Sequence, residues 1–311
     1  MSEPGRDQMR RRLRPSVGWL VPSLLIAAAF WLTSCGERTP NMDQEMFAAA
    51  SAQQEELIRG REAYMVYCVG CHGPQGDGKG QAAEFLKPQP RDFTKGTFKY
   101  ASVAAGELVR DDDLIRALNH GLPGSSMPRW NLLNETDKRA LVAYIKTFSS
   151  RFVYERPGQP LPIAPDPYGD PATEPEALER GKTVYHGFAG CYNCHPAYAT
   201  HDEIKVAAAA MGSVIPEGFS DSLYYEKPKI SDTWGDTIRP PDFTRRRLSN
   251  GNTLDDLYRV IQAGVGGTAM PTWYGVLETQ DIWAMAHYVR HLNMLRGTPA
   301  GDSLRQSYGI R

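Results

Sequence analysis

Two copies of a five-residue motif contain the side chains best suited to chemistry. They read Cys68-Val69-Gly70-Cys71-His72 and Cys191-Tyr192-Asn193-Cys194-His195. C-x-x-C-H is the attachment signature of c-type haem, because two thiols can add to the two vinyl groups of one porphyrin while the adjoining histidine reaches the iron. Four of the five cysteines lie in these motifs. The sequence therefore predicts two covalently bound haem c groups, with His72 and His195 as proximal iron ligands.

A zinc site or a redox dithiol would also use a C-x-x-C pair. A tetrahedral zinc site would need a second pair close by, and the two pairs are far apart in the chain. Zinc also gives no reason for a histidine directly after the second cysteine of each pair. The haem interpretation explains both the pairs and the histidines.

Composition excludes one class of partner. The 311 residues are 41% hydrophobic and 23% charged, which is a globular composition long enough for about two domains. The formal net charge is −1. Without a basic excess to neutralise phosphates, we expect no nucleic-acid partner.

Residues 1–34 have the features of an export signal. A positive stretch with Arg10, Arg11, Arg12 and Arg14 precedes an apolar run over residues 17–32. Leu32-Thr33-Ser34-Cys35 resembles the bacterial lipobox, which predicts that Cys35 is lipidated and anchors the chain. The alternative is an uncleaved transmembrane anchor, although the run is short of the ~20 residues that a span needs. Either way we expect the domains to face the periplasm or the cell exterior.

Five further segments follow the signal. We expect a polar tether over 35–55, a first domain over 56–151, a proline-rich linker over 152–175, a second domain over 176–296 and a loosely ordered tail over 297–311.

The two domains repeat one order of motifs. Each has an opening helical segment, C-x-x-C-H, a Pro-x-Asp-Phe-Thr element, a helix, a glycine, Met-Pro-x-Trp and a closing helix. The paired elements are 56–61 and 177–182, 90–94 and 240–244, 112–118 and 255–261, Gly121 and Gly264, and 127–130 and 270–273. The closing helices have apolar positions at helical spacing: Leu141, Tyr144, Ile145 and Phe148 in one, and Ile282, Met285, Tyr288, Val289 and Leu292 in the other.

This ordered set resembles class I cytochrome c domains in tandem, and the resemblance covers about two thirds of the chain. It implies a mostly α fold of two small helical domains, and it implies that a loop methionine is the distal iron ligand. By position these ligands are Met127 and Met270. Only these two of the ten methionines precede a proline. A thioether is a soft donor that favours ferrous iron, so His/Met ligation raises the reduction potential.

The same resemblance suggests supporting residues. A proline carbonyl, from Pro90 or Pro240, is expected to accept a hydrogen bond from the proximal histidine. Trp130 and Trp273 are expected to wall the haem crevices, where core packing is the alternative. The basic side chains Arg91, Arg129 and Arg245 are candidates for the haem propionates, or are solvated surface residues.

The remaining histidines are weaker ligand candidates. His120 and His186 have no counterpart in the other repeat, and His201 has no ligand partner in the sequence. His287 and His291 are four residues apart on a predicted helix and match a metal pair in spacing, but His287 aligns with Tyr144. We expect His287 to pack beside haem.

These features favour single-electron transfer between redox protein partners: a respiratory complex, a dehydrogenase or a soluble cytochrome. The enzyme alternative is a dihaem peroxidase or another dihaem c-type oxidoreductase, and a peroxidase requires an iron with a displaceable ligand. A redox or gas sensor is a third class, although no signalling domain is present. The second repeat also has an insertion, residues 201–240, which the sequence leaves open as a docking surface, a lid or a plain loop.

Overall fold

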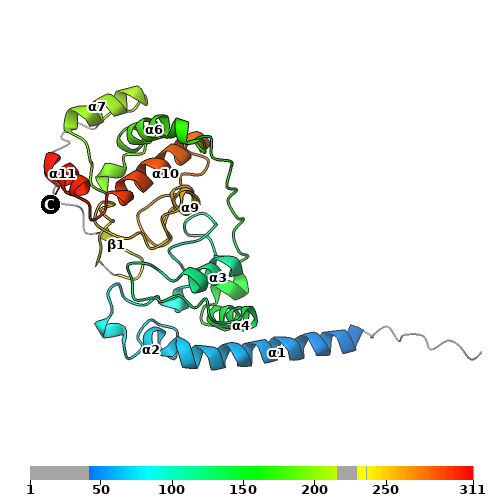
Figure 1. Ribbon diagram of the computed structural model, residues 1–311. Helices are drawn as coiled ribbons and strands as arrows, with labels where there is room; N and C mark the ends of the chain where they lie inside the picture. The colour runs from blue at the N-terminus through cyan, green and yellow to red at the C-terminus, as the bar shows by residue number, and fades with distance from the viewer. Residues whose placement is uncertain (1–41, 216–229, 236, 311) are drawn as a thin grey trace, which may run out of the picture. The chain divides into compact units, whose positions relative to one another are not determined.

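The computed structural model describes residues 42–215, 230–235 and 237–310, and the chain divides into two units, residues 1–49 and 50–311. The described residues form helices joined by long irregular segments (Figure 1). The α-helices are α1 (Met42–Tyr67), α2 (Val69–His72), α3 (Asp111–His120), α4 (Glu135–Lys146), α5 (Arg151–Tyr154), α6 (Glu174–His186), α7 (His201–Ala210), α9 (Leu254–Ala263), α10 (Thr279–Met294) and α11 (Pro299–Ser307). The 3₁₀ turns are η1 (Ala83–Phe85), η2 (Phe93–Lys95), η3 (Pro171–Thr173) and η4 (Cys191–Asn193).

The mostly α fold is confirmed. Among the described residues, strands are limited to β1 (Ile230–Ser231) and β2 (Thr237–Ile238), which pair antiparallel. The expected signal peptide, residues 1–34, and Cys35 lie outside the described residues. No helix within 42–215, 230–235 and 237–310 has the length and apolar character needed to cross a bilayer.

Helix α1 begins at Met42, well before the opening segment expected at residues 56–61. Alanine, glutamate and glutamine dominate the added turns, and these residues have high intrinsic helix propensity. Most side chains in these turns are exposed. The helix therefore forms here without an apolar face.

Residues 50–311 consist of a first half, which contains the first C-x-x-C-H motif, and a second half, which contains the second. In the first half, α1 and α4 meet at a glycine. A Cβ at Gly60 would collide with the carbonyl oxygen of Ala140, so only glycine allows this backbone approach. Tyr64 is fully buried beside Tyr144, with ring centroids 5.4 Å apart. The core around this crossing is built from Tyr64, Cys68, Phe93, Val109, Leu114, Leu118, Leu141, Val142 and Ile145.

The second half repeats this crossing with α6 and α10, which lie side by side (Figure 1). A Cβ at Gly181 would collide with the carbonyl oxygen of Ala284. Five predicted apolar positions of the closing helix are all buried here: Ile282, Met285, Tyr288, Val289 and Leu292. Helix α9 packs on α10 and contributes Leu257, Tyr258 and Ile261 to the same core.

Local side-chain caps define where the helices start. Asn134 accepts a hydrogen bond from the Asp137 amide at the start of α4, and Thr253 accepts one from the Asp256 amide at the start of α9. Each cap satisfies an amide that the first helical turn leaves without a backbone acceptor.

The C-terminal segment is ordered, and the expectation of a loose tail over 297–311 was wrong. Thr298 accepts from the Gly301 amide and Pro299 occupies the first turn of α11, which are helix-start signals that sequence reasoning passed over. Arg305 on α11 donates to the Thr244 carbonyl at 3.2 Å and to its hydroxyl at 3.0 Å. These bonds attach α11 to the Pro-x-Asp-Phe-Thr element of the second half, residues 240–244.

The proline-rich segment is irregular and packs along both halves. The Gly158 amide donates to the Leu108 carbonyl at 2.9 Å. Further along, Trp283 of α10 donates from Nε1 to the Ala164 carbonyl at 3.1 Å.

Candidate functional site

The first C-x-x-C-H motif continues directly from α1. The Cys68 amide donates to the Tyr64 carbonyl at 2.9 Å, and the motif then turns into α2, which ends at His72. The Tyr64 hydroxyl donates to the Gly73 carbonyl at 2.6 Å, just beyond the motif. The long helix and this buried tyrosine together fix both ends of the motif.

The His72 ring is held on two sides. Its Nδ1 lies 3.0 Å from the Arg91 carbonyl oxygen, and because a carbonyl can only accept, Nδ1 carries the proton and Nε2 retains its lone pair. Phe93 stacks on the ring at 4.4 Å and 16°. Burial lowers the pKa of His72 and favours the neutral form that binds metal. This arrangement is that of an imidazole prepared for an axial position.

The acceptor for His72 is Arg91, so the expectation for Pro90 was wrong by one residue. A Cβ built on Gly78 would lie 2.5 Å from the Pro90 carbonyl oxygen. The Pro90 carbonyl therefore faces the loop that follows the first motif, residues 73–80, and not His72. The Asp92 carboxylate accepts from the Thr94 amide at 2.8 Å and sets the turn. That turn directs the carbonyl just before Asp92 towards the histidine.

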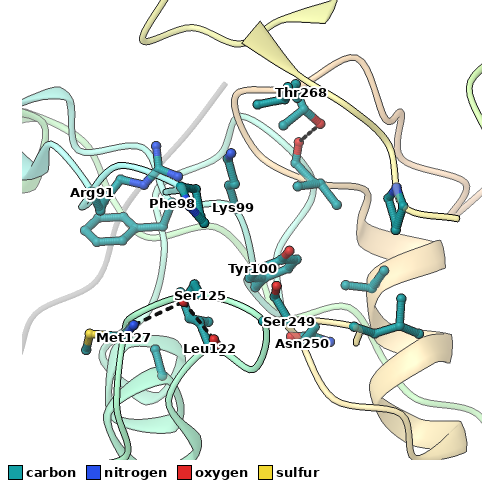
Figure 2. Close-up of a pocket in the computed structure, with 18 of the residues that line it drawn as sticks. Arg91, Phe98, Lys99, Tyr100, Leu122, Ser125, Met127, Ser249, Asn250 and Thr268 are labelled. Carbon is teal, nitrogen blue, oxygen red and sulfur yellow. Dashed lines mark hydrogen bonds between the residues drawn. The ribbon is translucent and has the colours of Figure 1, made fainter. Parts of the chain in front are cut away.

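Met127 lies in a tight loop after α3. The loop closes when the Leu122 amide donates to the Met127 carbonyl at 3.1 Å. Ser125 lies between the two ends, as Figure 2 shows: its hydroxyl donates to the Leu122 carbonyl at 2.7 Å and accepts from the Met127 amide at 3.2 Å. Gly121 has φ +62°, and a Cβ there would crowd the Met127 carbonyl oxygen. A glycine is therefore needed at this position before the loop.

The second motif has the same supports. His195 donates from Nδ1 to the Pro241 carbonyl at 2.9 Å and stacks on Phe243 at 4.7 Å and 20°. The acceptor is therefore Pro241, and the expectation for Pro240 was again wrong by one residue. The Tyr185 hydroxyl donates to the Pro196 carbonyl at 2.8 Å, which is the residue directly after the motif histidine, as in the first half.

The Met270 loop is closed like the Met127 loop. The Val265 amide donates to the Met270 carbonyl at 3.3 Å. The Thr268 hydroxyl donates to the Val265 carbonyl at 2.8 Å and accepts from the Met270 amide at 3.2 Å. Gly264, with φ +77°, has the role of Gly121. Sequence reasoning missed Ser125 and Thr268, although a hydroxyl residue two positions before each methionine was a detectable signal.

All eight predicted ligand residues line one cavity of about 1810 Å³. They are Cys68, Cys71, His72 and Met127 from the first half, and Cys191, Cys194, His195 and Met270 from the second. A usual ligand pocket occupies about 300–1,000 Å³, so this cavity exceeds the needs of one ligand. Trp130 and Trp273 are part of its wall, as expected.

Main-chain and side-chain bonds join the two halves around this cavity. The Ala105 amide donates to the Ala263 carbonyl at 2.8 Å, and Arg116 pairs with Asp256 at 3.0 Å. Tyr100 of the first half and Ser249 of the second lie close together in the wall of this cavity (Figure 2). The cavity thus lies between two halves that are docked to each other.

The lining fits a porphyrin with carboxylate side groups. Eight of the lining residues are Lys or Arg and four are Asp, so the wall has a net positive charge that suits propionates. The indole Nε1 of Trp234 lines the cavity, is buried, and has no acceptor among the described residues; a carboxylate would satisfy it. Burial raises the pKa of the Cys68 and Cys191 thiols to about 12, which disfavours the thiolate that a redox dithiol needs.

The other candidate residues lie elsewhere or have other partners. The Nδ1 of His186 lies 2.7 Å from the Lys182 carbonyl, and burial lowers the His186 pKa to about 4. His287 does not line the cavity and pairs through Nε2 with Asp166 at 2.9 Å, so its expected place beside haem was wrong. Within the described residues no group of three His, Cys, Asp or Glu side chains could hold a metal ion.

The arginine candidates separate into different roles. Arg91 lines the cavity and its guanidinium lies over the Trp234 ring. Arg245 is half-exposed and lies 3.9 Å from Asp242, and neither it nor Arg129 lines the cavity. Only Arg91 of the three is therefore placed to meet a propionate.

Comparison with known proteins supports a cytochrome c assignment for the first motif. The sequence model of the family described as "Cytochrome C oxidase, cbb3-type, subunit III" matches residues 55–145, which contain the first motif and Met127. Residues 55–145 are therefore a cytochrome c domain. The chain is also similar to a chain of the Kuenenia stuttgartiensis reducing HAO-like protein complex Kustc0457/Kustc0458, with 29% identity and a TM-score of 0.61 over 75% of this chain and 95% of that one. No curated protein matches the chain.

A c-type cytochrome carries haem c covalently and transfers electrons, because haem iron exchanges one electron between its ferric and ferrous states. In the first half, the chain's own residues orient the two predicted ligands. The Arg91 carbonyl and Phe93 fix the plane of the His72 ring, while Ser125 fixes the loop of Met127. Pre-set ligands need little rearrangement when the iron changes charge.

Proposed function

We propose that the chain is a membrane-anchored dihaem cytochrome c made of two tandem class I domains. One observation carries this proposal: both C-x-x-C-H motifs and both Met-Pro loops line the same cavity. Each half also repeats the backbone acceptor for its histidine, the stacked phenylalanine, the hydroxyl in its methionine loop and the glycine at its helix crossing. The second half thus repeats each of these four supports of the half that the cytochrome family model matches.

Two haems opening onto one cavity would pass electrons from one to the other within the chain. With a histidine and a methionine placed at each site, both irons would have two protein ligands and no open coordination position. Such a protein conducts electrons between redox partners and does not transform a substrate. We propose that it works on the periplasmic side between a respiratory complex, a dehydrogenase or a soluble cytochrome.

The peroxidase alternative is disfavoured by the carboxylates. Cleavage of peroxide would need an acid poised over an accessible iron, and the four acids that line the cavity already accept hydrogen bonds. Asp77 accepts from the Lys79 amide, Asp92 from the Thr94 amide, Asp113 from the Ser102 amide and Asp256 from Arg116. Their roles are those of caps and ion pairs.

Haem content and spin state test the proposed function. We expect two haems c per chain by pyridine haemochrome assay, and a low-spin ferric spectrum with two equivalents of the methionine-to-iron charge-transfer band. Cys191→Ser with Cys194→Ser should reduce the haem content to one. A high-spin haem that turns over peroxide in the wild-type protein would contradict the proposal.

The anchor is tested separately because it depends on residues outside the described structure. We expect Cys35→Ser to move the cytochrome from the membrane fraction to the soluble fraction, since the thiol is the predicted lipidation site. Ser34→Ala, which keeps Cys35, should leave the protein on the membrane. If Cys35→Ser stays membrane-bound after a high-salt wash, an uncleaved apolar segment is the anchor.

A further inference from the structure

The turn between β1 and β2, residues 232–235, belongs to the insertion of the second half but contacts the first half. Trp234 lies in this turn, and its ring centroid is 3.5 Å from the Cζ of Arg91 and 5.6 Å from the Nζ of Lys99. A cation over an aromatic face at this range is attracted to the ring. The guanidinium of Arg91 is therefore covered by a residue from the other half.

Backbone and charge contacts fix this turn in place. Asp232, whose side chain is 1% exposed, pairs with Lys99 at 3.3 Å. The Thr233 amide donates to the Gly267 carbonyl at 2.9 Å, and the Gly266 amide donates to the Lys99 carbonyl at the same distance. The turn is thus anchored to both halves independently of the Trp234 ring.

Arg91 is also the residue whose carbonyl accepts the His72 Nδ1 proton. The side chain and the carbonyl belong to one residue, so a ring that restrains the guanidinium also restrains the peptide that meets the histidine. The second site has no equivalent restraint, because there the acceptor is Pro241, whose side chain is uncharged. The two sites differ at this point, although their other supports match.

We propose that Trp234 is a positioning residue for the axial histidine of the first haem. By holding Arg91 it keeps the Arg91 carbonyl in hydrogen-bond range of His72. This bond makes the imidazole a stronger donor, which stabilises ferric iron and lowers the reduction potential of the first haem. The insertion thereby acts on the ligand of the neighbouring half. The inference rests on the haem c that the proposed function places at the first site.

The test follows each haem through its own methionine methyl and histidine ring resonances in NMR, together with a potentiometric titration. In Trp234→Ala we expect the first haem's potential to rise and its histidine resonances to shift. The second haem should keep its histidine resonances. Trp234→Phe retains an aromatic face and should restore most of the wild-type values.

Arg91→Ala separates this mechanism from a general loosening of the protein. It keeps the backbone carbonyl and removes the guanidinium, so its histidine shift should match that of Trp234→Ala, and the double variant should add little. Arg116→Gln is the control, because it breaks another ion pair between the halves and touches neither residue. The first haem's histidine resonances should be unchanged in it.

Three results would overturn the proposal. If the first haem of Trp234→Ala has the potential and histidine resonances of the wild type, Trp234 has no positioning role. The haem assignment would be unaffected by that result. The same shift in Arg116→Gln and Trp234→Ala would assign the effect to docking of the halves. A wild-type protein without a low-spin first haem would instead overturn the haem assignment, and the positioning role with it.

Discussion

Replacing Met270 by alanine is expected to halve the methionine-to-iron charge-transfer band and to lower the reduction potential of one haem only. The loop that presents Met270 is closed through Thr268 and Val265, so the backbone should keep its path without the thioether. Axial ligands move haem potentials over a range of ~0.8 V, and loss of the soft sulfur donor removes the preference for ferrous iron. Difference spectroscopy and redox titration measure both effects.

Three further variants test whether the loss of the band is specific to the predicted ligands. Met127→Ala should give the same spectral loss at the first haem, so that Met127→Ala with Met270→Ala abolishes the band. Met285→Leu is the control, because Met285 is a buried core residue of α10 that does not line the cavity. A volume-conserving swap there should leave the spectrum unchanged. If Met270→Ala also leaves it unchanged, Met270 is not an iron ligand.

The largest expected effect on stability is at the glycine of a helix crossing. Gly181→Ala places a methyl group against the Ala284 carbonyl and 2.7 Å from the Cβ of Tyr288, so α6 and α10 must move apart. Overpacking in a close-packed interior costs about 1–3 kcal/mol, and a backbone collision belongs at the upper end. Chemical denaturation followed through haem absorbance should show the loss in the free energy of unfolding.

Two other glycines complete this experiment. Gly60→Ala should destabilise the crossing of α1 and α4 to a similar degree, because its Cβ would meet the Ala140 carbonyl. Gly169→Ala is the control: its Cβ would lie 3.5 Å from the Asp166 carbonyl oxygen, an ordinary contact. There the change should stay within about 0.5 kcal/mol. Equal stability of Gly181→Ala and the wild type would show that the helices can separate freely.

The sequence predicted the features that local spacing determines. The two C-x-x-C-H motifs, the Met-Pro loops and the apolar faces of the closing helices are local patterns of the sequence. The structure brings the motifs and loops to one cavity and packs each closing helix into the core of its own half. The histidine acceptors were off by one residue, because a carbonyl's direction depends on the turn set by Asp92 and its equivalent, Asp242. A proline is conspicuous in a sequence, whereas a peptide orientation is not.

Other features depend on contacts that spacing cannot show. Trp234 contacts Arg91, although more than a hundred residues separate them in the sequence. No pattern in either segment indicates this contact. His287 aligns with Tyr144, yet it pairs with Asp166 from the linker, since α10 is covered there by a segment without an equivalent in the first half. The start of α1 and the helix α11 have favourable helix propensity or capping residues but no apolar period, so a search for apolar periods does not predict them.

The position of the cavity between the two halves bears on the order in which the protein is assembled. Thioether formation requires each thiol to meet a vinyl group, and Cys68 is only 7% exposed in the docked structure. The Ala105–Ala263 and Lys99–Gly266 main-chain bonds join the halves beside the cavity. If the proposed function holds, we therefore expect haem attachment to precede docking. The attached haem would then become part of the surface on which the halves assemble.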